Sequence, residues 1–161
     1  MPRFYVPTPL EIGQQLVLPE AVAHHLLVLR LGPAAPVTLF NGEGGEYTAT
    51  ISSIEKKRVG VEIKTFSPRE AELPYAITLA QALPESSKLD WIIEKAVELG
   101  VAAIQPLAAQ RCVVRLNSER AEKKQNHWQA VIVAAAEQSG RNRLPTLSSL
   151  SPFNDWAQQQ D

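Results

Sequence analysis

The sequence predicts an α+β protein with two domains, a small β-barrel followed by an α/β domain with a mostly parallel sheet. Residues 36–66 contain short runs in which apolar side chains alternate, the period of β-strands. Residues 75–161 alternate strand-like apolar runs with segments of helical period. Residues 67–74 between them are polar and hold two prolines, which indicates a linker. We therefore expect one domain over residues 1–70 and another over residues 74–161.

In the first domain, strands are expected at residues 37–40, 46–54 and 59–63. Residues 41–45 are glycine-rich but lead into a strand, so a hairpin turn is favoured over a phosphate-binding loop, which needs a helix N-terminus. A short helix is expected within residues 19–31 and should pack on the barrel. Its apolar face consists of Val22, Leu26 and Leu29.

In the second domain, strands are expected at residues 75–83, at residues 101–107 and shortly after Pro145. Helices are expected over residues 86–99, from Asn117 or Ser118 to Gly140, and over residues 152–159. The first two have apolar faces made of Leu89, Ile92, Ile93, Ala96 and Leu99, and of Trp128, Val131, Ile132, Ala135 and Ala136. Alternating strands and helices imply parallel strands, and such sheets bind ligands at the carboxyl ends of their strands.

Composition excludes several classes of protein. Cys112 is the one cysteine, so an internal disulfide and a site of several thiolates are excluded. No run approaches the roughly 18 apolar residues of a spanning helix, and the start of the chain lacks the apolar region of a signal peptide. His24 and His25 should point about 100° apart on a helix, which is poor for sharing a metal. We expect a cytoplasmic protein without a metal.

The positive charge is concentrated in one stretch. The net charge is -1, but residues 111–143 hold seven lysines and arginines against three glutamates. Arginines of this kind contact phosphates in RNA-binding proteins. The expected RNA-binding residues are Arg3, Arg30, Arg111, Arg115 and Arg143.

Two groups of carboxylates are candidates for chemistry. Glu137 should lie in the last turn of a helix, where a carboxylate opposes the helix dipole by about 0.3–1 kcal/mol. Two explanations stand equal: Glu137 pairs with Arg141, or it joins Gln138, Arg141 and Arg143 in holding a polar ligand. For the row formed by Asp90, Glu94 and Glu98, a solvated helix face is favoured over acid–base catalysis.

Several segments, in their order along the chain, resemble the RsmE family of 16S rRNA uridine-N3 methyltransferases. They are PRFY at residues 2–5, HLLVLR at 25–30, LFNG at 39–42, EY at 46–47, QALP at 81–84, KLDWIIEKAVELG at 88–100, RCVV at 111–114 and EQSGR at 137–141. Together they span nearly the whole chain, and the combination is specific although each segment alone is weak.

The resemblance implies a PUA-like β-barrel that binds RNA, followed by a SPOUT-type methyltransferase domain. Such proteins are homodimers that use S-adenosylmethionine to methylate N3 of a uridine in 16S rRNA of the small ribosomal subunit. Within that reaction, we expect Arg141 to stabilise the uracil anion, Glu137 to orient the base or accept its proton, and Gln138 to read the base edge.

The family continues into a C-terminal knot that binds the methyl donor and contains Gly-Pro-Glu-Gly-Gly and Arg-Ile-Leu-Arg segments. Neither segment occurs in this sequence. We therefore expect a partial SPOUT domain, cofactor-binding residues beyond residue 161, and a chain that is inactive alone. The alternative functions are a non-catalytic RNA-binding or ribosome-assembly module and, more weakly, a protein-interaction fragment.

Overall fold

The protein is described from a computed structural model in which residues 1–85, 88–109 and 118–159 are placed. The chain folds into two compact units. Unit 1 consists of Met1–Ala71 and Gly140–Arg143, and unit 2 consists of Glu72–Ser139 and Leu144–Asp161. The short segment Gly140–Arg143 therefore groups with unit 1, although it follows a helix of unit 2.

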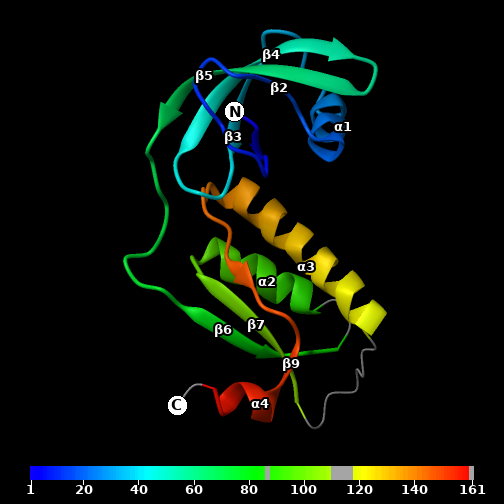
Figure 1. Ribbon diagram of the computed structural model, residues 1–161, viewed down its shortest axis with the longest axis vertical. Helices are drawn as coiled ribbons and strands as arrows, with labels where there is room; N and C mark the ends of the chain where they lie inside the picture. Colours follow the sequence, from blue (N-terminus) through cyan, green and yellow to red (C-terminus); the bar gives the residue numbers. More distant parts are fainter. Residues whose placement is uncertain (86–87, 110–117, 160–161) are drawn as a thin grey trace. The chain divides into compact units, whose positions relative to one another are not determined.

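Unit 1 is built on a five-stranded sheet with the order β1-β3-β4-β5-β2. The strands are β1 Arg3–Tyr5, β2 Gln15–Val17, β3 Pro36–Phe40, β4 Glu46–Glu55 and β5 Arg58–Ser67. The expected strands β3, β4 and β5 are confirmed, and the long β4–β5 hairpin curves across the unit in Figure 1. β1 pairs with β3 in parallel, whereas the other neighbours are antiparallel. Two register shifts within the hairpin bend it.

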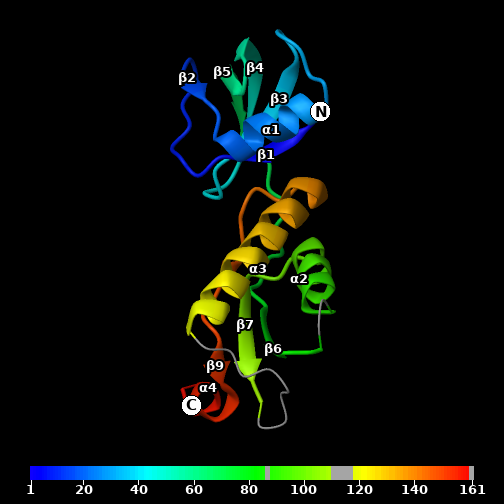
Figure 2. The same cartoon turned by 90° about the vertical axis from the view of Figure 1, so that its right-hand side faces the viewer.

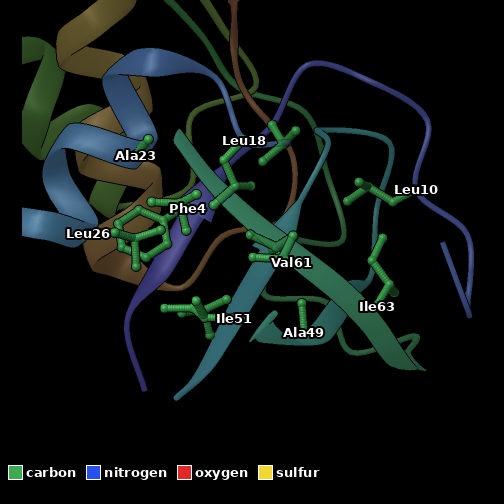
Figure 3. Close-up of a cluster of buried hydrophobic side chains, with 13 residues drawn as sticks. Phe4, Leu10, Leu18, Ala23, Leu26, Ala49, Ile51, Val61 and Ile63 are labelled. Carbon is green, nitrogen blue, oxygen red and sulfur yellow. The ribbon is translucent and has the colours of Figure 1, made fainter. Parts of the chain in front are cut away.

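The core of unit 1 lies between this curved sheet and helix α1, Glu20–Val28 (Figure 3). Ala23 and Leu26 of α1 are buried, and Leu26 lies beside Phe4 of β1. The expected burial of Leu29 is wrong, since Leu29 caps the helix and is 46% exposed. Arg30 follows in a left-handed conformation with φ 55°, so the helix ends one residue before the last apolar position of its period.

Unit 2 contains a small parallel sheet, as expected. Its strands are β6 Thr78–Ala82, β7 Ala103–Ala108, β8 Thr146–Leu147 and β9 Ser151–Pro152. β7 pairs in parallel with each of the other three. Both predicted strands begin too early. β6 begins at Thr78, and Tyr75 and Ile77 before it are exposed. β7 begins at Ala103, two residues after the predicted start.

The helices of unit 2 are α2 Lys88–Glu98, α3 Ser118–Ser139 and α4 Phe153–Ala157. α2 and α3 lie side by side in both Figure 1 and Figure 2. α2 buries Leu89, Ile93 and Val97. The expected burial of Leu99 is wrong, because α2 ends at Glu98 and Leu99 is 76% exposed. Trp128, Ile132, Ala135 and Ala136 of α3 are buried as predicted.

Within the placed residues, no helix combines the length and apolar character needed to cross a membrane.

Candidate functional site

The segment Gly140–Arg143 brings the end of the predicted EQSGR motif into unit 1. α3 ends at Ser139, and Gly140 adopts φ 79°, which confirms that Gly140 terminates the helix. The guanidinium of Arg69 donates a hydrogen bond to the carbonyl of Gly140 at 3.0 Å. Arg69 thus binds the first residue that follows α3.

Asn142 is the most buried polar residue of this segment, with no exposed surface. Its Oδ1 accepts a hydrogen bond from Nη2 of Arg3 at 2.6 Å, and its Nδ2 donates to the carbonyl of Arg69 at 2.6 Å. The same Nη2 of Arg3 reaches the carbonyl of Arg141 at 3.3 Å. A buried amide must have both its polar atoms satisfied, and here the two bonds attach the segment to residues of the barrel.

Arg3 is held from several sides. Its Nη1 forms an ion pair with Glu46, and its guanidinium lies 5.1 Å from the ring centroid of Phe40. Glu46 is also 3.4 Å from Nη1 of Arg69. We call the group Arg3, Glu46, Arg69 and Asn142 the arginine clamp. Because only 15% of the Arg3 side chain is exposed, the guanidinium serves the fold, and a phosphate contact by Arg3 stays a prediction.

The sequence did not single out Asn142 or Glu46 for this group. Asn142 stands in a loop, where no periodicity marks a buried position, and its partner Arg3 is 139 residues away in the chain. The sequence held one signal for Asn142: it is a neutral amide that stands between Arg141 and Arg143.

The three predicted catalytic residues occupy different surroundings. Arg141 is 3% exposed. Glu137 is half-buried and Gln138 is exposed, both in the last turn of α3. Their proposed catalytic roles stay predictions, since no substrate contacts them.

The other predicted RNA-binding arginines divide into two groups. Arg30 is exposed after α1, and the side chain of Arg143 is 52% exposed with its Nε 3.5 Å from Glu70. Arg111 and Arg115, like Cys112 and Asn117, lie outside the described residues. The structure therefore leaves Arg30 and Arg143 as accessible cations.

The carboxylates of α2 are engaged in surface pairs. Lys95 Nζ lies 2.8 Å from Glu94 and 2.9 Å from Glu98, and Asp90 Oδ2 lies 2.6 Å from Nε2 of His127. The hydrogen bond and charge of Lys95 lower the pKa of Glu94, and the hydrogen bonds that Lys95 donates to Glu94 and Glu98 raise the pKa of Lys95. These exposed pairs support the interpretation of a solvated helix face.

The carboxyl end of β7 contains a cavity of about 360 Å³ lined by Ala108, Ala109, Pro152, Phe153 and Asn154. S-adenosylmethionine presents an ammonium, a carboxylate, ribose hydroxyls and a sulfonium, whereas this lining offers one side-chain amide and no charged side chain. This cavity therefore does not suit it. No group of three or more His, Cys, Asp or Glu side chains among the placed residues is arranged to hold a metal.

Comparison with known proteins covers both units. A family model described as an RNA methyltransferase domain matches residues 71–161, and one described as an RNA methyltransferase PUA domain matches residues 18–64. Ribosomal RNA small subunit methyltransferase E of Bacillus subtilis is 33% identical over 139 residues, which are 86% of this chain and 54% of that protein. The protein of that name from Synechocystis is 32% identical, over 91% of this chain and 47% of its own length.

Solved structures give the same result. A ribosomal RNA small subunit methyltransferase E from Neisseria gonorrhoeae, bound to S-adenosyl methionine, is 42% identical with a TM-score of 0.93, over 97% of this chain and 64% of that one. A putative methyltransferase from Legionella pneumophila, in complex with the same cofactor, is 36% identical with a TM-score of 0.94, over 98% and 65%.

The chain thus spans about half to two thirds of the length of the relatives it matches. The predicted fold class, a PUA-like domain followed by a SPOUT-type domain, is confirmed. Since the methyltransferase model alone covers more than half of its residues, the chain belongs to the RNA methyltransferase family that includes the ribosomal RNA small subunit methyltransferase E proteins.

Proposed function

We propose that the whole protein carrying this chain transfers a methyl group from S-adenosylmethionine to N3 of a uridine in 16S rRNA of the small ribosomal subunit. The main support is the 42% identity over 97% of the chain with an S-adenosyl methionine-bound ribosomal RNA small subunit methyltransferase E. In this proposal, unit 1 binds the RNA and unit 2 contributes to the methyltransferase domain. A 16S rRNA substrate in turn favours a cytoplasmic protein, and the family resemblance favours a homodimer.

The proposed RNA contacts are arginines. Arg30 and Arg143 are exposed and present guanidinium groups that suit phosphate oxygens. Arg111 and Arg115 are proposed as further phosphate contacts from the sequence alone. Arg3 can contact RNA only through the 15% of its side chain that is exposed. Neutralising several phosphates makes the affinity fall steeply with salt.

The chemistry at the base requires removal of a proton. N3 of uracil is an imide nitrogen, and it becomes a good nucleophile when its proton leaves and negative charge spreads over the ring. We assign the stabilisation of that charge to Arg141, whose low exposure strengthens its electrostatic effect. Glu137 orients the base or accepts the proton, and Gln138 reads the base edge.

These roles concern the base alone. S-adenosylmethionine, when bound to the whole protein, supplies the electrophilic methyl group. The target base must leave its stack to be reached, and a base that contacts Arg141 must also displace the groups that now bury its side chain.

The test is methyl transfer by the whole protein. Purified small ribosomal subunits lacking the modification are incubated with S-adenosylmethionine carrying a labelled methyl group, and the nucleosides of each rRNA are identified by mass spectrometry. We expect N3-methyluridine in 16S rRNA and none in large-subunit rRNA. RNA binding without any methylated nucleoside would favour the ribosome-assembly module. If the protein showed neither RNA binding nor methyl transfer, the protein-interaction fragment would remain.

The cofactor is tested separately on the chain. Isothermal titration of the 161-residue chain with S-adenosylmethionine should show weak binding or none, whereas the whole protein should bind. Micromolar affinity of the chain alone would contradict the placement of the cofactor-binding residues beyond residue 161.

A further inference from the structure

Two consecutive glycines in the β3–β4 turn lie against an arginine and an aromatic ring. Gly44 has φ 110° and Gly45 has φ 67°. A Cβ atom on Gly44 would collide with the guanidinium of Arg143 and the carboxylate of Glu70, and one on Gly45 would collide with the ring of Phe66. Consecutive Cα atoms are about 3.8 Å apart. The guanidinium and the ring therefore lie at neighbouring positions along one turn of unit 1.

The ring of Phe66 is supported but open. Tyr47 is its cross-strand partner, and the two ring centroids are 4.9 Å apart at an interplanar angle of 48°. Gly45 lies against one edge of the Phe66 ring, yet 44% of Phe66 remains exposed. Single exposed apolar residues are common on protein surfaces, so the ring alone indicates nothing. What distinguishes this ring is its contact with Tyr47, together with the cation that lies against the preceding residue of the same turn.

The cation is only loosely paired. Nε of Arg143 lies 3.5 Å from Oε1 of Glu70, and the same oxygen accepts a hydrogen bond from the backbone N–H of Gly45 at 2.8 Å. About half of the Arg143 side chain is exposed. An ion pair this open to water contributes little stability, so Arg143 can exchange its carboxylate partner for a phosphate at low cost.

We propose that Phe66, backed by Tyr47, stacks on an unpaired base of the RNA while Arg143 binds an adjacent phosphate. Proteins read single-stranded RNA by stacking its bases on aromatic side chains and holding its backbone with cations, and here the ring and the guanidinium lie against consecutive residues of one turn. The inference rests on the proposed function, because it assumes that unit 1 binds RNA, and it adds a contact to a base where the arginines supply contacts to phosphates.

The test uses a fluorescein-labelled decauridylate and the 161-residue chain, with affinity measured by fluorescence anisotropy over a range of salt. Phe66→Leu should weaken binding about tenfold, in the range of a lost base–aromatic stack, and leave the salt dependence unchanged. Phe66→Tyr keeps the ring and should bind as the wild type does. Arg143→Gln should reduce the slope of log affinity against log salt by about 0.7, the value for one phosphate of a single strand.

Two controls separate stacking from other effects. Tyr75→Leu removes an aromatic ring that is 62% exposed in unit 2, and it should not change the affinity. A decamer with the same phosphates but no bases should bind the wild-type chain about tenfold more weakly than decauridylate, a comparison that needs no variant.

The outcomes are distinct. Equal affinity for the abasic decamer, a Phe66→Leu variant that binds normally, or a Phe66→Tyr variant as defective as Phe66→Leu would overturn the stacking site while leaving RNA binding intact. A wild-type chain that binds neither oligonucleotide nor a 16S rRNA fragment would instead refute the RNA-binding function on which the site rests.

Discussion

The arginine clamp and the open basic positions of unit 1 use the same type of residue in opposite ways. Arg3 and Arg30 both belong to segments that predict RNA contacts. In the clamp, Arg3 binds Glu46 and Asn142 and is largely covered. Arg30 is exposed after α1 and forms no ion pair with another described residue. A guanidinium that is covered and already paired with protein groups is poorly placed to neutralise a phosphate, whereas an exposed guanidinium can do so.

The difference has an energetic consequence. Removing one member of a buried, hydrogen-bonded group leaves its partners desolvated and unpaired, which is costly. Removing an exposed charge changes stability by at most about 0.5 kcal/mol. Variants in the clamp should therefore act mainly on folding, and variants at open positions mainly on binding.

The largest effect is expected at Asn142. Asn142→Ala removes two hydrogen bonds and leaves Nη2 of Arg3 and the carbonyl of Arg69 with fewer partners. We expect a loss of about 3 kcal/mol, or a fall in melting temperature of about 6–12 °C for a chain of this size. Circular dichroism melts measure it, with the exposed Asn126→Ala of α3 as the matched control. Equal melts for the two variants would show that the clamp does not stabilise the fold.

The next effect concerns catalysis by the whole protein. Arg141→Ala should lower the single-turnover rate of methyl transfer about a hundredfold, as loss of a group that stabilises transition-state charge typically does. Arg141→Lys should remain defective, because lysine lacks the planar fork of arginine. Since Arg141 is only 3% exposed, its removal also affects packing, so rates are compared at a temperature where every variant is folded. Normal rates in folded variants would end the catalytic assignment.

The smallest effect is expected on α2. Lys95 lowers the pKa of Glu94, so the pair stabilises the fold above the pKa that Glu94 has in the unfolded chain. That contribution is lost as the pH falls through the lower pKa of the folded state, and it is small because the pair is exposed. NMR titration should show Glu94 below its usual range in the wild type and restored by Lys95→Gln. If Glu94 titrated normally in the wild type, the ion pair with Lys95 would not form in solution.

The sequence predicted elements whose pattern repeats within a few residues. β3 to β5, β6, β7, α2 and α3 were predicted because each is long enough to show its period. β1 and β2 have three residues each, too few to alternate visibly. Leu29 and Leu99 were misplaced for one reason: each keeps the period of its helix but stands one residue past its end.

The candidate site was predicted only in part. The motif at residues 137–141 predicted a polar cluster, and the family resemblance predicted that this cluster takes part in uridine methylation. The clamp could not be predicted, because it joins Arg3 and Asn142 across nearly the whole chain and periodicity reports only on near neighbours. Neither could the support of Phe66 by Gly45, which depends on the fold of the β3–β4 turn.

The different roles of the covered and the open arginines are tested most directly by comparing Arg3→Gln with Arg30→Gln, with the salt dependence of binding to a 16S rRNA fragment and the melting temperature measured for each chain. We predict that Arg30→Gln reduces the salt slope by about one for its lost phosphate contact and leaves the melting temperature unchanged. Arg3→Gln should lower the melting temperature and change the slope less than Arg30→Gln does. The opposite pattern, a lower slope with an unchanged melt for Arg3→Gln and an unchanged slope for Arg30→Gln, would contradict this prediction.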